Sequence, residues 1–275
     1  KLNMEKIPKK IHYCWFGNGE MSEKEKKCME SWHKFCPNYE IIKWNEENYD
    51  ITKNKYMYQA YKAKKWGFVP DFARLDIIYN EGGIYLDTDV ELVKNIDDLL
   101  ENEAFIGFES GIYINPGAGF GATKNNKEIK ELLKIYENRD FYNSDGALNL
   151  TPSPILHTEF LTNQGLIRNN KMQIINGMKI YPTEFFSSMD YETGIINNTI
   201  NTYSIHRYSM SWMDKNKKKW NLRQQKLAQK IGINKAKIII KIVSKPSKII
   251  NRLRNDGLNK TIKFVLSKVK RNEKQ

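Results

Sequence analysis

Two aspartates separated by one residue, Asp87 and Asp89, are the strongest chemical signal in the sequence. They directly follow the apolar residues 84–86, which predict a short buried strand. In open α/β sheets, ligands bind outside the carboxyl ends of the strands, so both carboxylates are expected at such an edge. Mg²⁺ and Mn²⁺ prefer carboxylate oxygens and complete their coordination with phosphate oxygens. The pair therefore predicts either a site for Mn²⁺ or Mg²⁺ and a phosphorylated ligand, or a solvated turn.

Other polar residues could join this pair. Asp71 and Arg74 are three residues apart in a predicted helix, and this spacing places them on one helix face. They could project into the same cleft as Asp87 or form a surface ion pair. His206 is a candidate third metal ligand, and the indole N–H of Trp212 could donate to a phosphate oxygen. A structural role is the alternative for His206.

The elements that must position these residues alternate between strands and helices. The sequence predicts strands over residues 11–16, 39–44, 84–86, 104–108, 117–122, 174–181 and 202–206. It predicts helices after the Ser22-x-x-Glu25 capping box and over residues 56–66, 71–80 and 128–138. Parallel strands joined by helices imply right-handed crossovers. We therefore predict an α/β fold with a Rossmann-like, mostly parallel central sheet flanked by helices.

Charge is distributed unevenly along the 275 residues. Residues 213–275 contain 20 Lys and Arg against 3 Asp and Glu, and because the whole chain carries +13, residues 1–212 carry −4. We expect a catalytic domain at 1–212 and a basic amphipathic helical region at 213–275, with a surface helix over 259–271. This region could attach to an anionic membrane surface, or it could be a solvated helical pair packed on the body.

Cysteine content and hydropathy limit the class of protein. The three cysteines, Cys14, Cys28 and Cys36, are an odd number without metal-ligand spacing, which predicts buried reduced thiols in a cytosolic protein. The sequence contains no run of about 18 apolar residues, so we expect no membrane-spanning helix. Residues 1–11 lack the apolar region of a secretory signal. The expected location is cytoplasmic, at the inner face of the plasma membrane if the basic region binds lipid.

Three segments resemble a known family, in the order that the family has. They are IPKKIHYCWFG at 7–17, the stretch 71–90 that ends in GGIYLDTDV, and IHRYSMSW at 205–212. The chain is thus similar to glycosyltransferases with the D-x-D sugar-binding region. This family includes fungal outer-chain mannosyltransferases, bacterial capsule glycosyltransferases and the catalytic domains of large clostridial toxins. The resemblance implies a GT-A fold and a retaining, metal-dependent hexosyl transfer.

The resemblance also implies a binding role for four residues near the nucleotide-sugar donor. Trp15 matches the aromatic residue that stacks on the nucleotide base, and Tyr85 matches a tyrosine near the donor. Ser211 and Trp212 match a Ser-Trp pair that closes over the diphosphate.

Five polar residues match the family's catalytic and metal positions. Asp71 and Arg74 match residues that hold the donor sugar hydroxyls and the diphosphate. Asp87 matches a carboxylate near the ribose and the metal, and Asp89 matches the direct metal ligand. His206 matches a late histidine beside the metal, although the toxins use a carboxylate near this point.

The expected function is transfer of a hexose from a nucleotide-sugar donor, a UDP-sugar, to a saccharide acceptor. A lipid-linked acceptor in bacterial surface polysaccharide synthesis fits the basic tail. A toxin-like transferase acting on a protein hydroxyl, a metal phosphohydrolase and a nucleic-acid-binding protein are the alternatives. The acidic body and the lack of a nucleic-acid motif argue against the last, so no nucleic-acid partner is expected.

Overall fold

The computed structural model describes residues 6–17, 19–210, 213, 215–243, 257, 259, 260 and 263. The chain forms two compact units. The sheet unit consists of Lys1–Met189 and Asn197–Trp212, and the tail unit consists of Asp190–Ile196 and Met213–Gln275. The short segment Asp190–Ile196 therefore groups with the tail, and the domain boundary at residue 212 stays a prediction.

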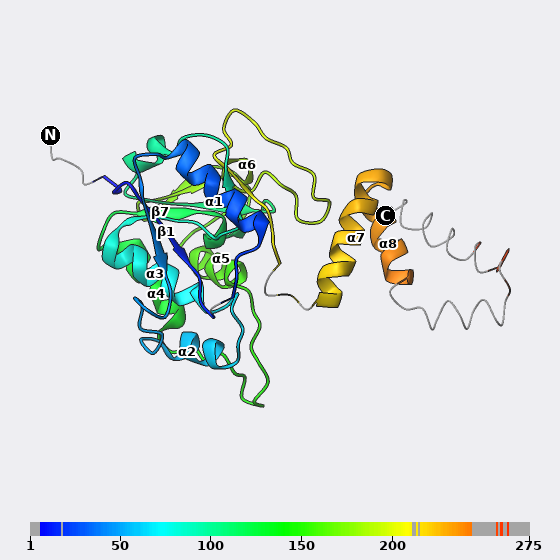
Figure 1. Ribbon diagram of the computed structural model, residues 1–275, viewed down its shortest axis with the longest axis horizontal. Coiled ribbons are helices and arrows are strands. Elements are labelled where there is room, and N and C mark those ends of the chain that lie inside the picture. Colours follow the sequence, from blue (N-terminus) through cyan, green and yellow to red (C-terminus); the bar gives the residue numbers. More distant parts are fainter. Residues whose placement is uncertain are drawn as a thin grey trace. The chain divides into compact units, whose positions relative to one another are not determined.

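An eight-stranded mixed sheet forms the centre of the sheet unit (Figure 1). Its strands are β1 (Lys10–Cys14), β2 (Glu40–Trp44), β3 (Gly83–Tyr85), β5 (Ala104–Glu109), β6 (Tyr113–Ile114), β7 (Phe120–Ala122), β8 (Gln173–Ile175) and β9 (Met178–Tyr181). The order is β2-β1-β3-β7-β5-β9-β8, with β6 paired to β5. The pairs β1–β2, β1–β3 and β5–β9 are parallel, and β7 is antiparallel to both of its neighbours. Five of the seven strands in this order thus share one direction, which confirms the mostly parallel sheet.

Helices cover both faces of the sheet. They are α1 (Glu23–Phe35), α2 (Lys55–Lys62), α3 (Pro70–Glu81), α4 (Lys127–Glu137), α5 (Ser153–Asn163) and the short α6 (Thr183–Phe186). Figure 1 shows α1 on one side of the sheet and α3 and α4 on the other. Successive strand residues point to opposite faces, so Ile84 packs in the core beside α1 and Tyr85 in the core beside α3. The predicted α/β architecture with flanking helices is confirmed.

Local sequence signals explain where two of these helices begin. The capping box predicted at Ser22 is present, with the Glu25 side chain accepting from the Ser22 backbone N–H. Helix α3 begins with Pro70, whose missing N–H costs nothing at the first helical position. It ends at Gly82, which has a φ of 64°. This end feeds directly into β3 and sets α3 against the strand that leads to Asp87.

A second, two-stranded sheet joins distant parts of the chain. Strand β4 (Val90–Leu92) pairs antiparallel with β10 (Ser204–His206), and His206 lies opposite Val90. Because Val90 directly follows Asp89, this pairing places His206 beside Asp89. Two short 3₁₀ helices complete the unit: η1 (Asp97–Glu101) follows β4 in the chain, and η2 (Pro116–Ala118) precedes β7.

Two of the predicted strands were wrong in extent. The apolar run 174–181 forms the hairpin β8–β9, because Asn176 and Gly177 adopt φ values of 49° and 96°. Two consecutive residues with positive φ make the tight turn for which Asn-Gly is the favoured sequence. The predicted strand 117–122 is extended only over β7, because η2 and Gly119 at φ 133° occupy its first half.

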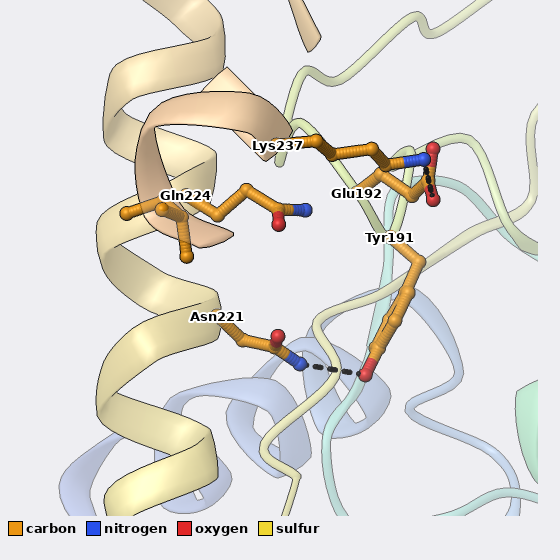
Figure 2. Close-up of a pocket in the computed structure, with 6 residues that line it drawn as sticks. Tyr191, Glu192, Asn221, Gln224 and Lys237 are labelled. Carbon is orange, nitrogen blue, oxygen red and sulfur yellow. Dashed lines mark hydrogen bonds and ion pairs between the residues drawn. The ribbon is translucent and has the colours of Figure 1, made fainter. Parts of the chain in front are cut away.

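The tail unit is a helical hairpin that holds a loop. Helix α7 (Lys215–Ile231) packs against α8 (Ile233–Val243). The Asn221 amide donates to the Tyr191 hydroxyl at 2.9 Å, and Lys237 pairs with Glu192 (Figure 2). The side chain of Gln225 donates to the Tyr191 carbonyl at 2.8 Å. These contacts tie Asp190–Ile196 to the two helices.

Two further expectations concern residues outside these elements. All three cysteines are buried and free, as predicted. Of the surface helix predicted over 259–271, the structure describes only residues 259, 260 and 263, and the rest lies outside the described residues. Within the described part of the chain, no helix is both long enough and apolar enough to span a bilayer.

Candidate functional site

The D-x-D segment forms the turn that connects the two sheets. The Leu86 N–H donates to the His12 carbonyl at 3.1 Å, which continues the β1–β3 pairing. The Asp87 N–H donates to Gly117 O at 3.1 Å, and the Val90 N–H returns to Asp87 O at 3.0 Å. The Arg207 N–H donates to Asp89 O at 2.9 Å, so both aspartates are held by backbone hydrogen bonds at the carboxyl end of β3, where ligands of α/β sheets bind.

Arg74 connects the helix motif to this turn. Its Nη2 atom lies 3.2 Å from Asp71 Oδ1 and 3.6 Å from Asp87 Oδ1. The guanidinium also stacks over the Tyr85 ring, 5.2 Å from the centroid. The side chains of Arg74 and Asp71 are only 4 % and 3 % exposed, so the ion pair is buried, and the surface ion pair considered for these residues is excluded. Removing one partner of such a pair leaves an uncompensated buried charge.

Two tyrosines fix the carboxylates beside Arg74. The Tyr85 hydroxyl donates to Asp87 Oδ1 at 3.0 Å. The Tyr56 hydroxyl donates to Asp71 Oδ2 at 3.2 Å. Each carboxylate is thus oriented by a hydroxyl and by a guanidinium, which makes the group rigid before any ligand binds.

Asp89 faces β10, the last strand of the sheet unit. His206 Nε2 lies 3.3 Å from Asp89 Oδ1, and the Ser209 N–H donates to Asp89 Oδ2 at 2.6 Å. The other imidazole nitrogen, Nδ1, lies 3.7 Å from Glu109 Oε1 and 3.5 Å from the Asn115 amide nitrogen. His206 is therefore held between two carboxylates, one on each side of its ring.

The charges in this cluster are unbalanced. Burial opposes the charged form of His206, but Asp89 and Glu109 outweigh it and raise its pKa to about 10. Burial would raise the pKa of Asp89, yet His206 and Ser209 hold it well below its usual range. Burial raises the pKa of Asp87, and the neighbouring Asp89 adds to this effect while Arg74 opposes it. Four carboxylates, those of Asp71, Asp87, Asp89 and Glu109, thus surround only two cationic groups, Arg74 and the protonated His206.

These residues fit a divalent cation. Asp87, Asp89 and His206 each offer a ligand atom, and the three atoms lie within 4.8 Å of one another. Two carboxylates and an imidazole are suitable ligands for Mn²⁺, and the carboxylates also suit Mg²⁺. A bound cation would take the place of the proton that pairs His206 with Asp89. Asp89 is buried, and the Asp87 carboxylate, although 30 % exposed, is held by Tyr85 and Arg74, so a solvated turn does not describe the two aspartates.

A glycine shapes the space beside Asp87. A Cβ atom at Gly117 would lie 2.2 Å from Asp87 Oδ2, far inside the contact distance of any carbon and oxygen. Asn115 holds this glycine in place by accepting its N–H at 2.8 Å. Position 117 therefore needs glycine because the carboxylate occupies the place of the side chain.

The remaining predicted residues are placed differently. Trp15 follows β1 at the same edge of the sheet, and its indole N–H donates to Gly19 O at 2.7 Å. Its stacking on a base stays a prediction. Ser211 and Trp212 lie outside the described residues.

Sequence reasoning missed Glu109, Asn115 and Gly117. Glu109 carried the same signal as Asp87, because it is an acidic residue at the carboxyl end of a predicted strand. Only the pairing of β5 within the sheet and of β4 with β10 reveals that it meets His206. No signal in the sequence links Asn115 or Gly117 to the aspartates.

Residues 22–106 match the family described as "Glycosyltransferase sugar-binding region containing DXD motif". This match covers α1 to the middle of β5 and includes Asp71, Arg74, Tyr85 and both aspartates of the turn. Over residues 22–106 the chain is therefore similar to this family of glycosyltransferases.

Two curated relatives from Schizosaccharomyces pombe are similar over a part of the chain. Inositol phosphoceramide mannosyltransferase 3 is 33 % identical over 104 residues, which are 36 % of this chain and 29 % of the relative. Inositol phosphoceramide mannosyltransferase 1 is 30 % identical over 114 residues, 38 % of this chain and 34 % of the relative. The match thus spans about a third of these relatives. A solved structure, "PaToxG Glycosyltransferase", is 20 % identical, with a TM-score of 0.46, over 58 % of this chain and 70 % of that one.

Proposed function

We propose that the chain transfers a hexose from a nucleotide-sugar donor to a saccharide acceptor, with retention of the anomeric configuration. The observation that carries this proposal is the group of Asp87, Asp89 and His206, whose ligand atoms lie within 4.8 Å of one another beside the buried Arg74. A metal–diphosphate site needs anionic ligands on one side and a fixed cation for the phosphates on the other. The match of residues 22–106 to the D-x-D glycosyltransferase family supports the same proposal.

The residues act by positioning and by charge. When Mn²⁺ or Mg²⁺ is bound, it neutralises the charge that develops on the diphosphate leaving group. Asp89 and His206 would bind the cation from one side, and the Tyr85 hydroxyl keeps the Asp87 carboxylate oriented. Arg74 offers a preorganised positive charge, and Asp71 can accept from the donor sugar hydroxyls. Such fixed charges stabilise a transition state without reorganising during the reaction.

Retention needs no nucleophile from the protein. In the proposed step, the bond between the anomeric carbon and the diphosphate oxygen breaks, and the acceptor oxygen bonds to the same face of that carbon. The acceptor proton passes to the departing phosphate oxygen, so atoms and charges balance. The role of the protein is then to align the acceptor and to shield the loosened sugar.

The donor and acceptor are the finer parts of the proposal. A UDP-sugar is the proposed donor, with Trp15 stacking on the base. The acceptor is proposed to be lipid-linked, in surface polysaccharide synthesis at the cytoplasmic side of the plasma membrane. The names of the two relatives, inositol phosphoceramide mannosyltransferases, support a lipid-linked acceptor and make mannose the principal alternative sugar.

A thermal-shift panel of UDP-sugars and GDP-mannose, with and without Mn²⁺, tests the donor. A ligand at about 100 times its Kd stabilises the native state by about 2.7 kcal/mol, so the true donor should stand out. We expect the shift to require both nucleotide sugar and Mn²⁺. If no nucleotide sugar shifts the transition and simple phosphate esters are hydrolysed, the proposal fails in favour of a phosphohydrolase.

A further inference from the structure

One face of α7 carries five exposed cations in a straight row. They are Lys215, Lys219, Arg223, Lys226 and Lys230. Their spacing is i, i+4, i+8, i+11 and i+15, so at 100° per residue they occupy an arc of about 80°. With a rise of 1.5 Å per residue, the row is about 22 Å long. A shallow groove on the same face is lined by four of these cations together with Lys218 and Leu222.

Within the described part of the tail unit, the contacts of α7 with the loop Asp190–Ile196 come from another face of the helix. The loop contacts of α7 come from Asn221, Gln225 and Gln229, which donate to residues of Asp190–Ile196. These three residues lie about 120° around the helix from the centre of the cationic row. Figure 2 shows Asn221 and Gln224 directed toward the side of Tyr191 and Glu192. Arg223 also lies over the Trp220 ring of the same helix, 4.8 Å from the centroid. All five cations are nevertheless exposed, so they can contact a partner.

The row is also electrostatically unfavourable within the hairpin. The sequences of α7 and α8 contain no Asp or Glu. Like charges four residues apart on a helix repel one another, as in the pairs Lys215–Lys219 and Lys219–Arg223. An external anionic surface would attract these cations and so offset the repulsion between them.

We propose that this face of α7 docks on the anionic headgroups of a lipid bilayer. A straight row of cations on one helix face matches a plane of phosphates. Four of the five cations are lysines, which act as point charges and need no bidentate partner. Leu222 lies at the border of the row and is 38 % exposed, which places an apolar side chain at the same surface. Basic helices with exposed apolar residues bind in this way at the membrane interface.

This inference goes beyond glycosyl transfer and does not depend on it. Vesicle binding reports on α7 whether or not a nucleotide sugar is turned over. A failure of the donor experiments therefore leaves the docking proposal standing, and the reverse also holds.

The test is sedimentation of the whole chain with phosphatidylglycerol–phosphatidylcholine vesicles and with pure phosphatidylcholine vesicles. We expect binding to the anionic vesicles alone, and weaker binding at high salt because the charges are screened. The variant Lys219→Gln/Arg223→Gln/Lys226→Gln should lower the partition coefficient about a hundredfold, since each cation contributes roughly fivefold. Glutamine keeps the helix propensity, which circular dichroism checks.

The matched control removes three positive charges from the sheet unit. Lys24→Gln/Lys27→Gln/Lys130→Gln changes the net charge equally at exposed positions on α1 and α4. Its partition coefficient should stay within about twofold of the unaltered chain. Equal binding to both vesicle types, or an equal loss in the two triple variants, would overturn the proposal. It would also be overturned if the α7 variant lost binding to duplex DNA while its vesicle binding was unchanged.

Discussion

His206 Nε2 lies 3.3 Å from Oδ1 of Asp89, although the two residues are far apart in the sequence. The antiparallel pairing of β10 with β4 produces this contact, because it sets His206 opposite Val90. An imidazole and a carboxylate at this distance form an ion pair when the ring is protonated and share a cation when it is not. Without metal, the contact is therefore a stabilising ion pair. With metal, the same two side chains are ligands of the cation.

Removing the charge of Asp89 should abolish most of the activity. We expect Asp89→Asn to lower the transfer rate by about three orders of magnitude or more, about 4 kcal/mol of transition-state stabilisation. Mn²⁺ binding measured by calorimetry should weaken in parallel. The control Asp98→Asn removes a charge at an exposed position and should leave both quantities unchanged. Sugar transfer by Asp89→Asn at a rate near that of the unaltered chain would contradict the assignment.

Glu109 should support metal binding without being a ligand. Carboxylates that contact the far nitrogen of a metal-binding histidine fix its ring, and their loss typically costs about 10- to 100-fold in metal affinity. We therefore expect Glu109→Gln to weaken Mn²⁺ binding within that range. Glu103→Gln, at the exposed opposite end of β5, is the control and should have no effect. If the two variants bind Mn²⁺ equally well, Glu109 has no such role.

A methyl group at position 117 should displace the Asp87 carboxylate. A Cβ atom at position 117 would clash with Asp87 Oδ2, so in Gly117→Ala the carboxylate must leave the position in which Tyr85 and Arg74 hold it. We expect a large loss of Mn²⁺-dependent donor binding, with the circular dichroism spectrum retained. Donor binding equal to that of the unaltered chain would show that the position of this carboxylate is unimportant.

Asp71 should make the protein less stable as the pH rises. Burial raises its pKa from the ordinary 3.8 to about 6, with Asp87 acting in the same direction and Arg74 against it. The native state therefore keeps a proton that the unfolded chain has already lost between about pH 4 and 6. The contribution of Asp71 to the free energy of unfolding is at most about 3 kcal/mol. It is fully present below about pH 4 and is lost by about pH 6.

Urea unfolding across this pH range measures the effect. The Asp71→Asn variant cannot titrate, so its stability should fall less steeply between about pH 4 and 6 than that of the unaltered chain. The difference between the two proteins removes the contribution of all other groups. Parallel curves would mean that the Asp71 carboxylate titrates in the same way in the folded and unfolded states.

The sequence predicts most of the sheet because its strands are apolar runs between turn signals. Residues 84–86 and 104–108 were correctly placed for this reason. The β8–β9 hairpin was predicted as one strand, since its apolar residues continue on both sides of Asn176. There the turn residues Asn176 and Gly177 were a better guide than the apolar pattern.

The site could be predicted only where its residues are close in sequence. The pairs Asp71–Arg74 and Asp87–Asp89 each carry a local spacing, and the structure joins them through Arg74. For His206 the residues alone leave a structural role open, because a single histidine has no pattern, and only the family resemblance favours a place beside the metal. Glu109 meets His206 through strand pairings that no local sequence reveals.

An anomalous difference map tests the central claim most directly. Crystals grown with Mn²⁺ and a nucleoside diphosphate should show one strong peak in contact with the Asp89 carboxylate and His206 Nε2, with Asp87 and the diphosphate adjoining it. A peak elsewhere, with Asp87 and Asp89 pointing into solvent and away from the diphosphate, would contradict the account.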